Sequence, residues 1–497
     1  MTLNDDQEPM LRHEQFTEQI EHMEPLAVGG KHYQRLERKI GWIQGAMVNV
    51  SYIIGAGIFV GPALTLQLVG SGGMNLILWT IGAFVALSGT YTFMELGTML
   101  PRSGGEVGYL EYCYRRPKYL LAYLFTYWSL MNRSSGVASQ GIVFGGYINY
   151  AIFGPAYKSH WADRWWALFS ATILMLVNVF STRATMKLMG FLTVVKLFVL
   201  GLIAIIGLLV LLKVIPSDVD ASLNLSFYGT STTVGPYASA LYYVMNSYSG
   251  WHNLNYILDE VKDPIRNLPK ASAAALLTTA TLYILTNIAY LVVLPLDTMK
   301  NSEFIVAAAF FTKSLGQNFA SNVLPVFIGL SAFGCGAAIN FSAGRVIMEV
   351  SRQGLLPYGH VFGKVNPKIG SPVNAYLLQY GLSITFILVP PPGAVYQFIV
   401  AFAAYPVYVF YFLMALAVLI LRRREPNTKR PISAPLVPYV SAILSMVACT
   451  GFWYYQIVIK NTPGKSYNES IRDQGHAAIE QEIFGEYTSV PTAEQLT

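Results

Sequence analysis

Three glycines and a proline interrupt an apolar stretch near the start of the chain. Residues 52–62 read YIIGAGIFVGP and lie inside an apolar run from about 42 to 66, long enough to cross the ~30 Å core of a bilayer. A helix broken here frees amide N–H groups, and those of the second half-helix form an anion site that fits a carboxylate. Such a break must be packed in protein or line a cavity. Alternatively, the small residues only let helices pack closely.

Polar residues gather in a second apolar run, at 237–258. They include Asn246, Ser247, Ser249, His252 and Asn253. This polar density is unusual for a helix that faces lipid, so we expect a second broken helix that lines the same cavity. The two interrupted runs are the first and sixth predicted spans. Each span crosses the membrane in the direction opposite to the one before it, so two repeats of five spans start from opposite sides of the membrane. The second repeat therefore has inverted topology relative to the first. The pattern predicts an all-α polytopic membrane protein with a five-plus-five inverted-repeat fold and broken first and sixth helices.

The composition agrees with a membrane protein. The 497 residues are 54% hydrophobic and 12% charged, about half the ~25% charge of soluble domains. We predict eleven spans, at roughly 42–66, 75–100, 119–150, 165–182, 189–212, 237–258, 271–294, 322–349, 373–390, 395–421 and 436–459. Residues 1–40 are expected to form a disordered cytoplasmic tail, 41–459 the transmembrane domain, and 460–497 a polar C-terminal tail.

Basic residues indicate the orientation in the membrane. With the N-terminus in the cytoplasm, the inner loops hold seventeen Lys and Arg and the outer loops hold five, as the positive-inside rule requires. Eleven spans then place the C-terminus outside, where Asn224 and Asn468 lie in Asn-x-Ser sequons. The net charge of +6 is therefore a topology signal, and we expect the lipid bilayer as a partner and no nucleic acid.

Several ionisable residues fall inside the predicted spans. His252 lies beside the second break and is the first candidate for coupling to protons, with Lys196 and Glu95 as alternatives. Lys196 could instead extend to the inner membrane surface. Arg345 and Glu349 have the i, i+4 spacing of a helical ion pair.

Four motifs in chain order resemble the amino acid, polyamine and organocation transporter superfamily. They are Gly55-Ala56-Gly57-Ile58-Phe59 and the segments 101–109, 259–270 and 351–357. Within that superfamily the chain is similar to the L-type amino acid transporter branch, and most of all to fungal high-affinity methionine permeases. The resemblance implies the five-plus-five fold.

The resemblance also implies a substrate site. Amides matching Ala56 and Gly57, in the stretch that includes Gly55, would hold the substrate α-carboxylate. The α-ammonium would be held by the carbonyls that match Ile53, Asn246 and Ser249. Lys196 matches a family lysine in the region of the sodium site of sodium-coupled relatives, which implies sodium-independent transport.

The chain departs from the family pattern in three places. Asn246 stands where many relatives have an aromatic gate, so side-chain selectivity cannot be transferred. The outer loop between spans three and four has no cysteine, so we expect no disulfide-linked heavy chain. The family has twelve spans, whereas eleven are predicted here.

These observations favour a plasma-membrane secondary transporter that imports a neutral amino acid by alternating access with protons. Methionine is the best single substrate, because Phe402 and Tyr405, with Phe398, Val143 and Phe144, could form an apolar subsite. A broad neutral amino acid exchanger and a transporter-like amino acid receptor are the alternatives. We expect no enzyme, cofactor or metal site, since the sequence has no Walker-type loop, nucleophile elbow or metal-ligand spacing.

Overall fold

The computed structural model describes residues 37–434, apart from 115, 118, 155–158, 217–218, 234, 302–305, 317–322, 391–394, 427 and 429. Side chains at 301 and 395–405 are also outside this described part. The helices in chain order are α2 (Trp42–Ile53), α3 (Gly57–Val69), α4 (Gly72–Met99), α5 (Glu106–Cys113), α6 (Leu120–Phe153), α7 (His160–Phe180), α8 (Thr182–Leu211), α9 (Ala221–Asn224), α10 (Gly235–Tyr248), the 3₁₀ helix η1 (Asn253–Glu260), α11 (Pro264–Val293), α12 (Leu296–Asn301), α13 (Val306–Leu315), α15 (Leu324–Arg352), α16 (Gly359–Phe362), α17 (Val373–Leu388) and α18 (Val395–Arg424).

The helices confirm an all-α polytopic membrane protein. Within the described residues, α4, α8, α11, α15 and the part of α18 from Pro406 onward are long and apolar enough to cross a bilayer. The bent pair of α2 and α3 adds a sixth such span. Four further predicted spans form the shorter or more polar helices α6, α7, α17 and the α10–η1 pair. The eleventh predicted span, at 436–459, lies outside the described residues, and the repeat symmetry stays a prediction.

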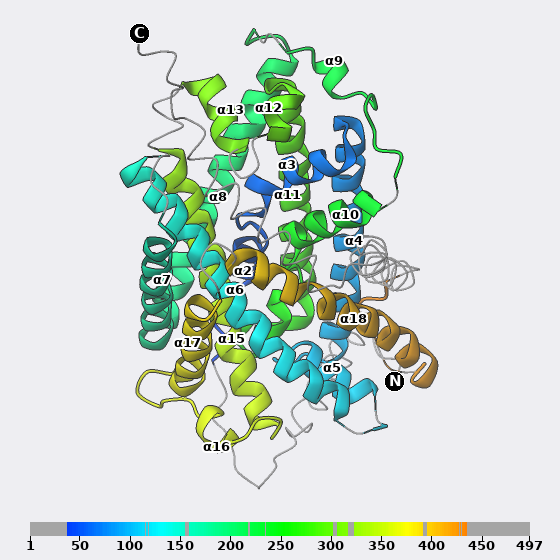
Figure 1. Cartoon of the computed structure of the whole chain (residues 1–497). Helices are drawn as coiled ribbons and strands as arrows, with labels where there is room; N and C mark the ends of the chain where they lie inside the picture. The colour runs from blue at the N-terminus through cyan, green and yellow to red at the C-terminus, as the bar shows by residue number, and fades with distance from the viewer. Residues whose placement is uncertain are drawn as a thin grey trace, which may run out of the picture.

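The short helices between the spans lie at opposite ends of the bundle. In Figure 1, α9, α12 and α13 lie at the upper end, whereas α5 and α16 lie at the lower end. The first three belong to connections after odd-numbered spans and the other two to connections after even-numbered spans. This arrangement agrees with the alternation of outer and inner loops on which the predicted orientation depends.

Helix α15 is the most enclosed span and holds the second half of span six. Its residues 334–351 are all buried, and the Arg345 Nε donates a 2.7 Å hydrogen bond to Glu260 Oε1 in η1. The guanidinium also lies over the Phe341 ring, with Cζ 3.8 Å from its centre. The predicted Arg345–Glu349 pair was therefore wrong, because η1 brings a carboxylate nearer to Arg345 than its own helix does.

The described part of the chain includes the last residues of the segment that was expected to be a tail. Lys39 and Ile40, which the sequence analysis assigned to the tail, both donate backbone N–H bonds to Glu260 O, at 2.8 and 2.9 Å. Ile40 also forms a bridge with Val261 and is 2% exposed. The end of the N-terminal segment is thus attached to the end of η1, whereas residues 1–36 lie outside the described part.

Candidate functional site

Span one is broken between Ile53 and Gly57. The axes of α2 and α3 meet at 44°, and α3 starts where Gly57 packs against α10. A Cβ on Gly57 would lie 2.8 Å from Ser247 Oγ, so only glycine allows this approach. In the first turn of α3 the Phe59 N–H donates to Ala56 O at 3.1 Å, and helix geometry leaves the N–H groups of Gly57 and Ile58 without an intrahelical acceptor. The predicted break and its donors are therefore present.

A buried lysine closes the carboxyl end of α2. The Lys196 Nζ donates hydrogen bonds to Ser51 O at 2.7 Å and to Ile54 O at 2.5 Å, and the residue is 1% exposed. Its ammonium compensates the partial negative charge at this helix end. Lys196 therefore does not extend to the membrane surface. It also lies behind the break and is not among the residues that line the cavity.

The carbonyl of Ile53 is already hydrogen-bonded within the protein. It accepts from Gly55 N–H at 3.0 Å and from the Tyr283 hydroxyl at 3.0 Å. Tyr283 also lies 3.1 Å from Ser247 O in span six. Because a hydroxyl has one proton, it donates to one of these carbonyls at a time, and the other retains a free lone pair for a ligand.

Span six is broken between Tyr248 and Asn253. Gly250 has a φ of +104°, a conformation that side-chain-bearing residues rarely adopt. A Cβ on Gly250 would lie 2.1 Å from Tyr52 Cδ1, so the two breaks are in direct contact through this glycine. The predicted second broken helix is thus confirmed, and it faces the first.

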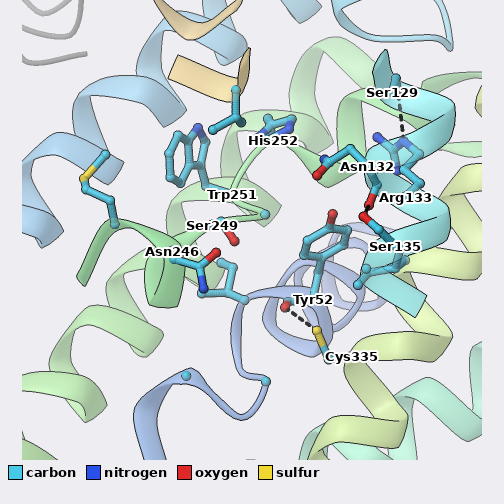
Figure 2. A pocket seen from close by; sticks show the side chains of 18 of the residues that line it. Tyr52, Ser129, Asn132, Arg133, Ser135, Asn246, Ser249, Trp251, His252 and Cys335 are labelled. Atoms are coloured by element: carbon cyan, nitrogen blue, oxygen red, sulfur yellow. Dashed lines mark hydrogen bonds between the residues drawn. The ribbon is translucent and has the colours of Figure 1, made fainter. Parts of the chain in front are cut away.

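The breaks enclose a cavity of about 150 Å³. Figure 2 shows Tyr52, Asn246, Ser249, Trp251 and His252 from the two broken spans around it. The predicted site residues that line it are Ile53, Gly55, Gly57, Asn246, Ser249 and His252. Ala56 is buried at the start of α3 and does not line it. Phe402 and Tyr405 lie in α18, but their side chains are outside the described part.

One face of α6 supplies the polar wall that the sequence analysis missed. Ser129, Asn132, Arg133, Ser135, Ser139 and Gln140 line the cavity, and Figure 2 shows the first four of them on the same side of the cavity as Tyr52. Ser129, Arg133 and Gln140 have the spacing of one helical face. This spacing could have predicted from the sequence that α6 presents a polar face to the cavity. Gln140 Oε1 is buried and has no hydrogen-bond partner in the described part of the chain.

The apolar wall comes from residues other than those predicted on α6. Val143 and Phe144 do not line the cavity. Phe144 packs instead against Phe333 and Trp166, with ring centroids 5.5 and 6.3 Å apart. Besides Tyr52 and Tyr256, the aromatic side chains that line the cavity are Trp128, Tyr242, Trp251, Tyr408, Phe410 and Tyr411.

A buried polar cluster closes one side of the cavity. The Glu106 Oε1 accepts a 2.8 Å hydrogen bond from the Tyr256 hydroxyl and lies 3.4 Å from His252 Nε2. The Arg133 Cζ lies 3.9 Å from the centre of the Tyr256 ring. Burial raises the pKa of Glu106, which is outside the spanning helices, to about 7, although the Tyr256 hydroxyl and the Arg133 charge oppose this shift. Glu106 was not predicted as a site residue.

Glu95, the remaining predicted coupling residue, lies in a different environment. Its carboxylate pairs with Arg422, at 2.5 Å from Nη2 to Oε2, and accepts from the Ala434 N–H at 2.9 Å. It is not among the residues that line the cavity. Its contacts connect α4 to the end of α18 and the residues that follow it, so the role that these contacts support is structural.

Comparisons with known proteins agree with this architecture. A sequence model of the amino acid permease family matches residues 40–468. The chain is 29% identical to the high-affinity methionine permease of Saccharomyces cerevisiae over 461 residues, or 90% of this chain and 77% of that protein. It is 30% identical to the human b(0,+)-type amino acid transporter 1, covering 83% of this chain and 82% of that protein. It is 29% identical to the human Asc-type amino acid transporter 1, covering 85% of this chain and 77% of that protein.

The family model and the similar proteins point to the same assignment. The family match extends over both broken spans and the cavity between them. The relatives are permeases and transporters rather than enzymes. This chain therefore belongs to the amino acid permease family.

Proposed function

We propose that this protein is a plasma-membrane secondary transporter that imports a neutral amino acid by alternating access. The observation that carries the proposal is the contact between the two breaks at the cavity. There, Gly55 and Gly57 of the first break and Asn246, Ser249 and Gly250 of the second line the same cavity, and no side chain caps the start of α3. A zwitterion needs donors for its carboxylate and acceptors for its ammonium, and two opposed broken helices provide both.

In this proposal the amides of Ala56 and Gly57 bind the α-carboxylate, and Gly55 lines the cavity beside them. The α-ammonium binds carbonyls of Ile53, Asn246 and Ser249. The Asn246 carbonyl accepts one 3.2 Å hydrogen bond from Ser249 N–H and keeps a second lone pair. The Tyr283 hydroxyl, shared between the Ile53 and Ser247 carbonyls, would release Ile53 when it donates to Ser247.

Methionine is the proposed substrate. The similarity to a fungal methionine permease extends over 90% of the chain, and Trp128 and Phe410 provide aromatic faces in the cavity. Thioether sulfur packs favourably against aromatic rings, and Phe402 and Tyr405 would extend this surface. The polar face of α6 suits other small neutral amino acids as competitors.

Protons rather than sodium are the proposed driving ion, with His252 as the first coupling residue. The Lys196 ammonium already occupies the Ser51 and Ile54 carbonyls, which a sodium ion would otherwise use. His252 lines the cavity beside a carboxylate, whereas Glu95 is held in its ion pair. We propose no disulfide-linked heavy chain, because the loop between α6 and α7 has no cysteine.

Counterflow in proteoliposomes tests this function. Vesicles loaded with unlabelled amino acid, and matched empty vesicles, take up labelled methionine under four conditions: with and without an inward pH gradient, and with and without sodium. We expect methionine to compete best in a panel of neutral amino acids, and the pH gradient but not sodium to stimulate uptake. Better competition by leucine and phenylalanine would replace methionine with a broad neutral substrate range. Uptake that needs internal amino acid under every condition would indicate an exchanger, and binding without uptake a receptor.

A further inference from the structure

Glu106 lies where three parts of the chain meet. It is the first residue of α5, in the connection between α4 and α6. Its Oε1 accepts from Tyr256 in η1 and lies 3.4 Å from His252 in the span-six break. The carboxylate therefore joins the connection after span two to the second half of span six.

The cluster has unused hydrogen-bonding capacity beside the cavity. Glu106 is 2% exposed and His252 is 8% exposed. In the described part of the chain, Glu106 Oε2 and His252 Nδ1 are buried without a hydrogen-bond partner. Both residues line the cavity. A polar atom left unpaired in a buried site is costly, so these two atoms mark a place where a proton or a hydrogen-bonding group is expected to bind.

The charged and titratable groups around Glu106 come from each neighbouring element. They are Arg133 of α6, His252 of the break, Tyr256 of η1, Tyr411 of α18, Tyr52 of α2, Tyr109 of α5 and, beside Gly104, Glu349 of α15. Arg133 donates hydrogen bonds to Ser129 and Ser342, at 3.2 and 2.8 Å. Glu349 approaches Gly104 rather than Glu106, so the charged groups nearest the cavity are one cation, Arg133, and one carboxylate, Glu106. Their summed charge changes from zero to +1 when Glu106 gains a proton.

We propose that Glu106, rather than His252 itself, binds the proton that is transported with the substrate, and that His252 and Tyr256 transmit its charge state to span six. This inference rests on the proposed proton-driven uptake. A proton from the cavity forms an O–H bond at Oε2, and the same bond breaks when the cluster faces the opposite compartment. Loss of the negative charge weakens the hydrogen bond from Tyr256, because charged acceptors bind more strongly than neutral ones. Protonation therefore loosens η1 from α5.

The ordinary acid–base properties of the site agree with this role. The pKa of Glu106, raised to about 7 by burial, allows both charge states to be populated near neutral pH. Tyr256 donates to the carboxylate and therefore favours its charged form. Removing that hydroxyl should move proton binding to higher pH.

The test compares E106Q, Y256F and D163N with the unmodified protein in proteoliposomes. Asp163 is a matched control, because its half-buried carboxylate on α7 accepts from Asn149 Nδ2 at 2.7 Å, away from the cavity. Three quantities are measured: counterflow of labelled methionine at equal pH from 5 to 8, uptake driven by a pH gradient, and acidification of a trapped pH dye on addition of methionine.

We expect E106Q to lose gradient-driven uptake and dye acidification by about tenfold or more, and its counterflow to become independent of pH. D163N should behave like the unmodified protein in all three measurements. Y256F should keep gradient-driven uptake, with the midpoint of its pH profile at higher pH.

Other outcomes separate this inference from the proposed function. Gradient-driven uptake and acidification by E106Q at the unmodified level would overturn the inference and leave the transporter intact. The same holds if monodisperse E106Q loses counterflow altogether, which would make Glu106 a substrate ligand. If E106Q does not fold, an unchanged pH midpoint in Y256F contradicts the role of Glu106. Counterflow without acidification in the unmodified protein would remove proton coupling itself.

Discussion

Lys196 and Gly57 show how single residues maintain the break in span one. Lys196 satisfies carbonyls that the broken helix leaves free, at Ser51 and Ile54. Gly57 lets Ser247 approach the start of α3. One residue thus compensates the open end of α2, and the other sets the distance between the two broken spans.

Replacing Lys196 by methionine should destabilise the protein. Methionine fills a similar volume but leaves two buried carbonyls without a donor, at about 1–3 kcal/mol for each. We expect a lower Tm in detergent and loss of methionine counterflow. Lys187→Met is the control, because Lys187 is exposed on the same helix. Equal Tm values for the two variants would show that the ammonium does not hold α2.

Gly57→Val should abolish methionine binding without preventing membrane insertion. The new side chain would contact Ser247 and fill the space beside the α3 amides. Gly201→Val is a suitable control, because no atom lies within 4 Å of a Cβ at that position. The readouts are the yield of monodisperse protein and the affinity for labelled methionine. Unchanged affinity would place the carboxylate elsewhere.

At the level of elements, η1 depends on contacts from distant parts of the chain. Arg345 of α15 holds Glu260, and the backbone of residues 39–40 pairs with the same end of η1. Because η1 is a short 3₁₀ helix, its position comes from these neighbours rather than from its own hydrogen bonds. The second half of span six is therefore held in place by two groups from distant parts of the chain.

Removing one partner of the buried Arg345–Glu260 pair should be strongly destabilising. Arg345→Met leaves an uncompensated carboxylate, at about 3–5 kcal/mol, so we expect a markedly lower Tm. The double variant Arg345→Met, Glu260→Gln should recover part of the loss, because no buried charge then remains unpaired. Lys262→Met, at an exposed position in the same connection, should leave Tm nearly unchanged. A Tm loss in the double variant as large as in Arg345→Met would contradict the ion-pair explanation.

Local sequence predicted the two breaks but not all of the cavity wall. Gly55, Gly57 and the polar run around Asn246 show the interruptions directly, because a break requires unusual residues where it occurs. Glu106 was missed because its role depends on how α5 returns beneath the cavity. Phe144 was assigned to the wrong surface, since composition does not fix the rotation of α6 in the bundle. For the same reason, the i, i+4 rule paired Arg345 with Glu349 rather than with Glu260, 85 positions away.

At the scale of the whole molecule, alternation of loops agrees with the predicted orientation. Helices α9, α12 and α13 share one end and α5 and α16 the other (Figure 1). The two sequons, however, differ in accessibility. The Asn224 Nδ2 donates to Leu291 O and Leu294 O at 2.8 and 2.9 Å, so its amide is not available to a glycan.

Glycosylation of Asn468 tests the complete topology. Eleven spans with a cytoplasmic N-terminus place residues 460–497 outside. Expression in a glycosylating host should therefore give a mass shift that Asn468→Gln removes and Asn224→Gln does not. Protease access to the C-terminal tail only from the cytoplasmic side would contradict this topology.

Recognition of a zwitterion by two opposed breaks is the central claim, and inhibition of methionine counterflow tests it most directly. Unlabelled methionine, N-acetylmethionine and methionine methyl ester share a side chain but differ in the α-ammonium or the α-carboxylate. We expect methionine to inhibit uptake of the label, and each of the two blocked compounds to inhibit at least tenfold less, since a charge-assisted contact is worth about 1.5–3 kcal/mol. Inhibition by the methyl ester as strong as by methionine would contradict a carboxylate site at the start of α3.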